Sequence, residues 1–143
     1  MKAIDEILQK ALQMGACNKS NGVTDWRTLV WLFFTPQGIE FCEKNNFPTL
    51  EMFKGIKEDV EPYNVFVNAG VQKRSNDSCV AFVGPKSKGE LVYDDNSKIH
   101  KVIVMHGAKV DLVLRNYAVV RLICIGDNNE VRKHRDKTAI ILE

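Results

Sequence analysis

The sequence predicts an α+β protein in which an N-terminal head of short helices, residues 1–58, packs on a C-terminal all-β repeat tail, residues 59–143. Three observations predict this fold class. Apolar residues recur at helical spacing in the first third, Val, Ile and Leu dominate a proline-free segment from Lys98 onward, and that segment repeats about every ten residues. With 143 residues, 45% of them hydrophobic, the chain can bury a core of ordinary size.

Apolar stripes mark the first two predicted helices. One side of residues 2–14 is apolar, and Gly15 follows where a C-cap glycine lies. The second helix is expected from about residue 26 to residue 34, with Thr24 or Asp25 as its cap. Its shared apolar face is formed by Trp26, Leu29, Val30 and Phe33.

Two further helix starts follow. At Thr35-Pro36 a capping residue precedes a proline, which is typical of the first turn of a helix, and this third helix is expected to run to about residue 44. A short fourth helix is expected to open at Pro48-Thr49 and to run through Phe53, and Gly55 follows as the residue that closes it.

Strand signals begin after the head. Asn64–Asn68 and Cys79–Val83 are short runs of β-branched and aromatic residues, and Gly70 and Gly84 lie close to them. These runs and the segment from Lys98 predict that the rest of the chain is β-structure.

The strand-rich segment consists of units of about ten residues: Ser97–His106, Gly107–Asn116 and Tyr117–Gly126. The next unit, Asp127–Asp136, departs from the pattern. When the units are stacked, their apolar positions align in a column (Val102, Leu112, Leu122 and Leu142). A parallel β-solenoid-like stack produces this period and is favoured. An antiparallel meander or sandwich with tight turns is the alternative.

A second apolar stripe lies on the other side of these strands. Because side chains alternate along a strand, inward-facing Leu112 and Leu114 place their neighbours outward. The outward positions nevertheless include apolar residues, which form a candidate interface: Ile103, Met105, Val113, Ile123 and Ile125. An apolar face must be covered, either by the helical head or by a second copy of the chain.

Several motifs resemble an uncharacterised family of small proteins from gut bacteria and their phages or mobile elements. They are G-I-E-F-C-E-K-N-N-F-P at Gly38–Pro48, H-G-A-K-V at His106–Val110 and N-Y-A-V-V at Asn116–Val120. The resemblance implies a helical head joined to a tail of degenerate N-A-x-V repeats. It implies no activity, because none is known for the family.

No catalytic or metal-binding set is recognisable, and no cofactor is expected. The histidines and the isolated cysteines lack the spacing of metal motifs (His100, His106 and His134; Cys17, Cys42, Cys79 and Cys124). His106 is instead expected at a repeat corner, near Asn116 and Asp136. Gly84–Gly89 is interpreted as a turn, because a phosphate loop would lead into a helix and this segment leads into a strand-like run.

The net charge of +2 is too small to indicate a nucleic-acid or membrane partner. The basic run Arg132–Arg135 is the best candidate for an anion or nucleic-acid contact, and an exposed hairpin tip is the alternative interpretation. The candidate cations are Arg115, Arg121, Arg132, Lys133 and Arg135.

Three functions follow from these patterns. The leading hypothesis is a non-enzymatic interaction or structural protein that binds itself or another protein, through a sheet face or the open end of the stack. The second is a weak binder of nucleic acid or phosphorylated ligands, and the third is an enzyme with a site in the groove between head and tail. Since the sequence shows no signal peptide and no membrane-spanning run, a cytoplasmic location is expected.

Overall fold

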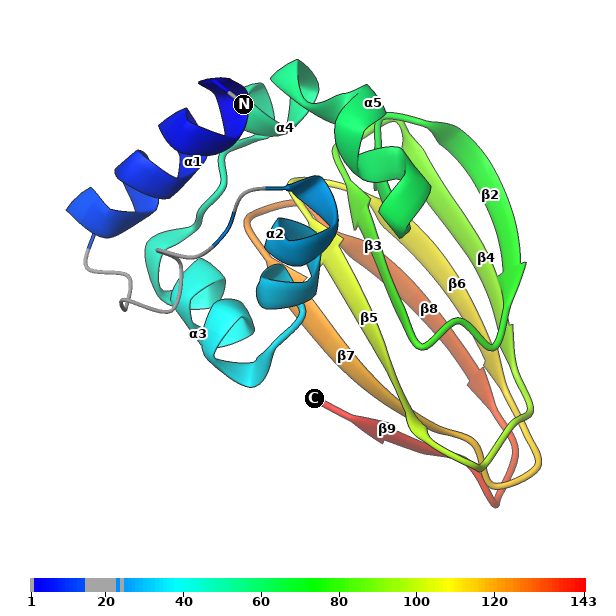
Figure 1. Cartoon of the computed structure of the whole chain (residues 1–143). Helices are drawn as coiled ribbons and strands as arrows, with labels where there is room; N and C mark the ends of the chain where they lie inside the picture. The colour runs from blue at the N-terminus through cyan, green and yellow to red at the C-terminus, as the bar shows by residue number, and fades with distance from the viewer. Residues whose placement is uncertain (1, 15–22, 24) are drawn as a thin grey trace.

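The computed structural model describes residues 2–14, 23 and 25–143. Figure 1 shows the helices gathered on one side of a pair of twisted sheets. The helices are α1 (Lys2–Gln13), α2 (Trp26–Phe33), α3 (Pro36–Asn45), α4 (Leu50–Gly55) and α5 (Lys57–Val60), followed by a 3₁₀ turn at Glu61–Tyr63. The strands are β1 (Val65–Val67), β2 (Gly70–Ser75), β3 (Cys79–Val83), β4 (Ser87–Tyr93), β5 (Ile99–Met105), β6 (Lys109–Leu114), β7 (Val119–Ile125), β8 (Glu130–Arg135) and β9 (Ile140–Leu142).

The predicted starts of the second, third and fourth helices are confirmed by their caps. The side chain of Asp25 accepts a hydrogen bond from the Thr28 amide, 2.7 Å away, at the start of α2. Thr35 and Thr49 cap α3 and α4 in the same way. Helical structure continues through α5, slightly beyond the boundary expected at residue 58. Thr24 and Gly15, the other predicted terminal residues, lie outside the described residues.

All strand pairs in the tail are parallel, which confirms the β-solenoid and excludes the antiparallel meander. Successive strands alternate between two sheets. The odd sheet has the order β1-β3-β5-β7-β9, and the even sheet has the order β2-β4-β6-β8. Each coil of the chain therefore contributes one strand to each sheet. The unit at residues 127–136, which departs from the sequence pattern, still forms β8 in regular register with β6.

The ten-residue period is half a coil, so the expected column of apolar residues is wrong. Val102 pairs with Leu122, whereas Leu112 lies on the even sheet. Leu142 pairs with Arg121 and not with Leu122. The reason is geometric, since ten residues make one strand and one corner, and a two-sided coil needs two of each before the chain returns to the same sheet.

The corners of the coil use left-handed backbone conformations. His106, with a φ of 56°, lies at the corner that follows an odd strand, and its Nε2 is 2.7 Å from the Pro48 carbonyl oxygen of the head. Asn116 lies at the opposite corner, where its amide side chain donates to the Asp94 carbonyl, 2.9 Å away, and its N–H donates to Asp136. The expectation that His106 stacks near Asn116 and Asp136 is therefore wrong, although its corner position is confirmed.

The space between the two sheets is filled by a closely packed apolar core. Phe82 is fully buried and stacks on Phe66, with ring centroids 5.6 Å apart. Gly89 of β4 lies directly over the Phe82 ring, and a Cβ atom at that position would be 2.6 Å from Phe82 Cζ. A glycine is required there because any side chain would displace the buried ring. His100 is also fully buried, and its ring nitrogens lie 3.0 and 3.1 Å from the carbonyl oxygens of Asp77 and Asp95.

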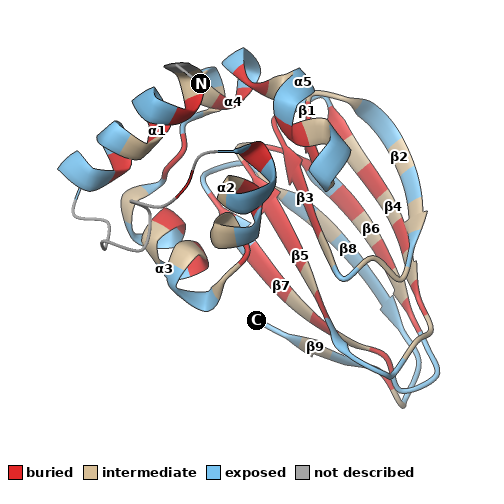
Figure 2. Ribbon diagram, viewed as in Figure 1, coloured by how far each residue is buried: buried red, intermediate tan, exposed pale blue. Residues whose placement is uncertain are grey.

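The head covers the outer face of the odd sheet (Figure 2). Four of the predicted interface residues lie on this face and are buried within the chain itself: Ile103, Met105, Ile123 and Ile125. Lys101 of β5 donates to the carbonyl oxygen of Phe34, 3.0 Å away, and so links the sheet to the end of α2. Of the two proposed covers for this face, the structure shows the helical head.

The prediction that Val113 shares an outward column with Ile103 and Ile123 is wrong. Val113 lies on β6 in the even sheet, in register with Val92 and His134, and it is half-buried. The outer face of the even sheet carries ion pairs such as Lys88–Asp111, at 3.7 Å. No helical element of the described chain was found packed there, and a polar face of this kind is compatible with solvent.

Charged side chains point inward at both ends of the solenoid. At the first end, Arg74 lies over the Phe66 ring, 5.2 Å from its centroid, and pairs with Asp77. At the last end, Lys133 and Arg135 occupy the inward positions next to Leu112 and Leu114. Lys133 pairs with Glu143, and Arg135 donates to the Ala139 carbonyl, 3.1 Å away. Inward-facing charges of this kind discourage end-to-end pairing of sheet edges.

Within the described ranges, no helix combines the length and apolar character that a membrane crossing requires.

Candidate functional site: an apolar cleft in the head

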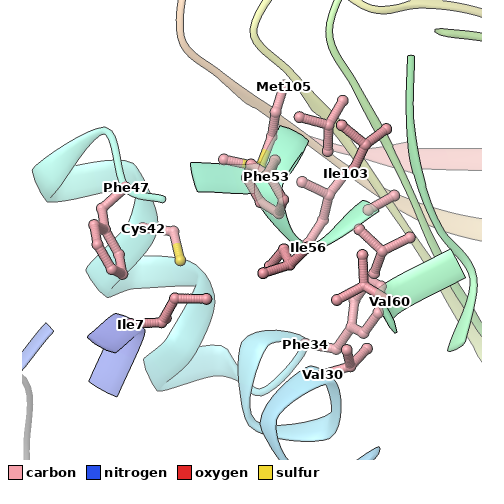
Figure 3. Packing of buried hydrophobic residues seen from close by; sticks show 14 of the residues in the cluster. Ile7, Val30, Phe34, Cys42, Phe47, Phe53, Ile56, Val60, Ile103 and Met105 are labelled. Carbon is pink, nitrogen blue, oxygen red and sulfur yellow. The ribbon is translucent and has the colours of Figure 1, made fainter. Parts of the chain in front are cut away.

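The head contains a cleft of about 340 Å³ between its helices. Its walls come from α1, α2, α3, α4 and the segment that leads into β1, and Figure 3 shows Cys42 and Phe47 on one side of this region with Ile56 and Val60 on the other. The apolar lining residues are Ile7, Leu8, Ala11, Leu29, Val30, Leu32, Phe33, Phe41, Cys42, Phe47, Pro48, Phe53, Ile56, Val60 and Val65.

Aromatic rings hold the walls in place. The rings of Phe41 and Phe47 meet edge to face with centroids 5.8 Å apart, and those of Phe33 and Phe53 do so at 6.2 Å. Such pairs have a preferred geometry and restrict side-chain rotation. The cleft is therefore built from side chains that already pack against one another.

The polar residues of the cleft lie along one side of α3. Gln37, Glu40 and Lys44 are all exposed, and their spacing of three and four residues places them on one helical face. The other described residues that line the cleft are apolar or glycine. The cleft therefore has apolar walls and a single polar rim.

Cys42 does not bring nucleophilic chemistry to this site. Burial, and to a smaller extent the neighbouring Glu43 carboxylate, raises the pKa of its thiol to about 12. Since the thiolate is the reactive form, Cys42 behaves as a small apolar side chain at neutral pH.

The surface of α2 near the cleft is unusually apolar. Trp31 is 68% exposed, and Leu29, Leu32 and Phe33 are only half-buried. In α2 only Trp26 and Val30 are buried, so apolar surface remains on the side of the cleft.

Comparisons with known proteins give no relative. No protein-family model matches the chain, and neither the curated proteins nor the solved structures contain a match. The resemblance to gut-bacterial and phage proteins stays a prediction, and function has to be argued from the geometry.

The structure does not bring the five candidate cations together. Arg115 pairs with Asp94 at 3.7 Å, and Arg132 lies 4.0 Å from Asp111 on the outer face of the even sheet. Lys133 and Arg135 point inward at the end of the solenoid, as described above. Arg121 lies on the odd sheet. Most of these charges are partnered and they face different directions, which is unlike a phosphate-binding surface.

A smaller hollow of about 210 Å³ lies where the head meets β7, close to the groove considered for an enzyme site. Its lining consists of Glu43, Arg121, Leu122, Ile123, Cys124 and Glu143. Burial and the nearby Glu143 carboxylate raise the pKa of the Cys124 thiol, which disfavours the nucleophilic thiolate. In the part of the chain that the structure describes, no group of three or more His, Cys, Asp or Glu residues is placed to hold a metal ion.

Proposed function

We propose that this protein is a non-enzymatic binding protein that holds an apolar partner in the cleft of its helical head. The observation that carries this proposal is the cleft itself. Its volume of about 340 Å³ lies within the range of about 300–1,000 Å³ typical of ligand sites. Its apolar walls and single polar rim match the composition of such sites.

The cleft is partly open to solvent, so its apolar walls stay in contact with water when it holds no partner. Removing apolar surface from water favours binding. An apolar void of about 150 Å³ is already large enough to bind benzene. Filling the cleft would restore dispersion contacts to the aromatic walls, and this gain favours binding.

The solenoid serves as the rigid support of the site. Ile103 and Met105 of β5 are fully buried under the head, and Phe53 and Ile56 belong to the same apolar cluster. The head is therefore anchored on a parallel sheet whose register is fixed over several coils. A binding site held on such elements needs little reorganisation.

The binding proposal is tested with the apolar fluorescent probe 1-anilinonaphthalene-8-sulfonate. The native protein is expected to bind it saturably at one site. The double substitution Ala11→Leu/Cys42→Leu adds five heavy atoms to the cleft walls, so it should narrow the cleft and weaken probe binding. The free energy of unfolding in urea should rise by about 0.5–2 kcal/mol or stay unchanged. Leu12→Gln is the matched control, because Leu12 is on α1, is 40% exposed and does not line the cleft. Equal probe binding by the double variant would contradict the proposal.

Self-association is a second candidate, and the exposed Trp31 favours it. Tryptophan is enriched among the residues that dominate protein interfaces. We expect the native chain to show concentration-dependent dimers in sedimentation velocity, and Trp31→Gln to be monomeric with stability changed by less than about 0.5 kcal/mol. Val71→Gln, at a site 56% exposed on β2, is the control. A strict monomer at high concentration would remove this candidate.

A further inference from the structure

We infer that the free edge of β7 in the last coil of the solenoid is a second binding surface, which takes an extended segment of a partner protein as an added parallel strand. This inference goes beyond the proposed function, because it concerns the solenoid and does not depend on the head cleft. Three features carry it: the register of β7, the hydrogen-bonding groups at its edge and the side chains that surround that edge.

Only the first part of β7 has a strand on both sides. β5 pairs with all seven residues of β7, whereas β9 pairs only with Val119–Arg121. Figure 1 shows β9 beside one end of β7. The stretch at residues 122–125 therefore has one free edge, although three of these four residues are buried.

The free edge consists of backbone groups that point away from β5. The Ala118 carbonyl accepts from the first amide of β9, 3.0 Å away, and the Ile125 carbonyl accepts from the amide of His106, directly after β5, at 3.0 Å. Because successive backbone groups alternate between the two sides of a strand, those of Leu122 and Cys124 face the β9 side. Beyond the last β9 pair, the Leu122 carbonyl and the Cys124 amide and carbonyl have no hydrogen-bond partner among the described residues.

These groups are matched by an extended polypeptide. Unpaired backbone groups beside a buried strand cost free energy, and one added strand supplies their donors and acceptors together. The hollow of about 210 Å³ lies on this edge, since Leu122, Ile123 and Cys124 line it. Charge does not select the partner, because the charged residues that line the hollow carry both signs: Glu43, Arg121 and Glu143.

The core of the last coil favours an apolar side chain in the added segment. Cys124 is exposed, although strand alternation places its side chain inward. Val131, an inward residue of β8 in register with Val110, is only half-buried. An added strand directs the residue that pairs with Cys124 inward as well, so an apolar side chain there removes both neighbours from water. The segment therefore alternates polar, apolar and polar residues.

The partner is expected to be another protein and not a second copy of this chain. End-to-end stacking of copies would bring the edge strands of the even sheet, β2 and β8, to this end of the solenoid. These strands carry charged residues at inward positions, where the added segment needs an apolar one: Arg74, Lys133 and Arg135.

The test is an NMR titration of the isotope-labelled native protein with the peptide acetyl-Thr-Val-Thr-Val-Thr-amide. The largest shifts are expected at the amides of residues 122–125, with a dissociation constant of about 0.1–3 mM, since the segment adds a few hydrogen bonds and one buried valine. A peptide methylated at its threonine nitrogens, which face β7, should bind about tenfold more weakly. Methylation of the valine nitrogens, which face away from β7, is the matched control and should leave the affinity unchanged.

Cys124→Pro tests the same edge from the side of the protein. Proline removes an N–H that points to the free edge and keeps the β5–β7 hydrogen bonds, so the peptide should bind about five- to tenfold more weakly. Cys124→Ala is the control, because it keeps the amide and should bind the peptide like the native chain. The two methylated peptides decide the question without any change to the protein, should the proline variant not fold.

Three outcomes would overturn the inference. The first is the absence of shifts at residues 122–125, and the second is equal affinity of the two methylated peptides. The third is a concentration-dependent shift of the same four amides without peptide, which would show that a second copy occupies the edge. None of these results bears on the head cleft, which the fluorescent probe tests separately.

Discussion

Ile103→Ala is expected to lower the free energy of unfolding by about 2–5 kcal/mol. Ile103 lies on the outer face of the odd sheet with no exposed surface, because the helical head covers it. Removing its side chain beyond Cβ loses the transfer free energy of three carbons and leaves a cavity that the sheet and the helices cannot easily close. Equilibrium unfolding in urea measures the loss, provided that the m-value stays constant.

Val113→Ala is the matched control for this experiment. Val113 occupies the outward position of the even sheet, where it is half-buried beside charged neighbours, so its truncation should cost less than about 1 kcal/mol. A single ten-residue stack would place Ile103 and Val113 in equivalent positions and predict similar losses. Similar losses in the two variants would therefore contradict the two-sided coil and the covering of only one face.

The sequence predicts much of the solenoid because strand alternation is local. Ile103 and Ile123 indicate a strand that is apolar on both sides, and the structure confirms this for β5 and β7. The sequence period cannot tell a one-sided stack from a two-sided coil, since both return an apolar position every ten residues or so. Only the register, with Val102 opposite Leu122, distinguishes them.

Local sequence patterns also fail to predict the edge strand β2 and the strand formed by the basic residues 132–135. β2 is mostly exposed and lacks the apolar alternation of a core strand, so propensity alone does not find it. The composition of residues 132–135 predicts a hairpin tip or an anion site, but the run lies within strand β8. Alternation along that strand then directs Arg132 outward and Lys133 inward, which divides the charges between two surfaces.

The cleft was not predicted, because a cavity depends on how helices pack and not on any one helix. A signal was nevertheless present in α2. Two apolar residues of α2, Trp31 and Leu32, lie outside its predicted apolar face. That face consists of Trp26, Leu29, Val30 and Phe33. More apolar residues than one buried stripe requires indicate a binding surface on a helix of this length.

Lys133→Leu/Arg135→Leu is expected to convert the protein into larger end-to-end assemblies. Both residues occupy inward positions of β8, in register with Leu112 and Leu114. With leucine there, the apolar columns of the core continue to the open end, where β8 also presents unpaired backbone groups. The β8 end or the β2 end of another copy can then pack against these leucines and form hydrogen bonds with the free backbone groups. Polar terminal coils normally prevent such stacking.

Sedimentation velocity over a range of concentrations measures this change relative to the native protein. Arg132→Leu is the matched control, because it adds the same apolar side chain to the same strand on the outward face, where it does not extend the core. Glu143→Gln tests whether loss of the Lys133–Glu143 pair alone is sufficient, and it should leave the assembly state unchanged because exposed pairs contribute little. If the double variant sedimented like the native chain, the inward charges of β8 would not be what prevents end-to-end association.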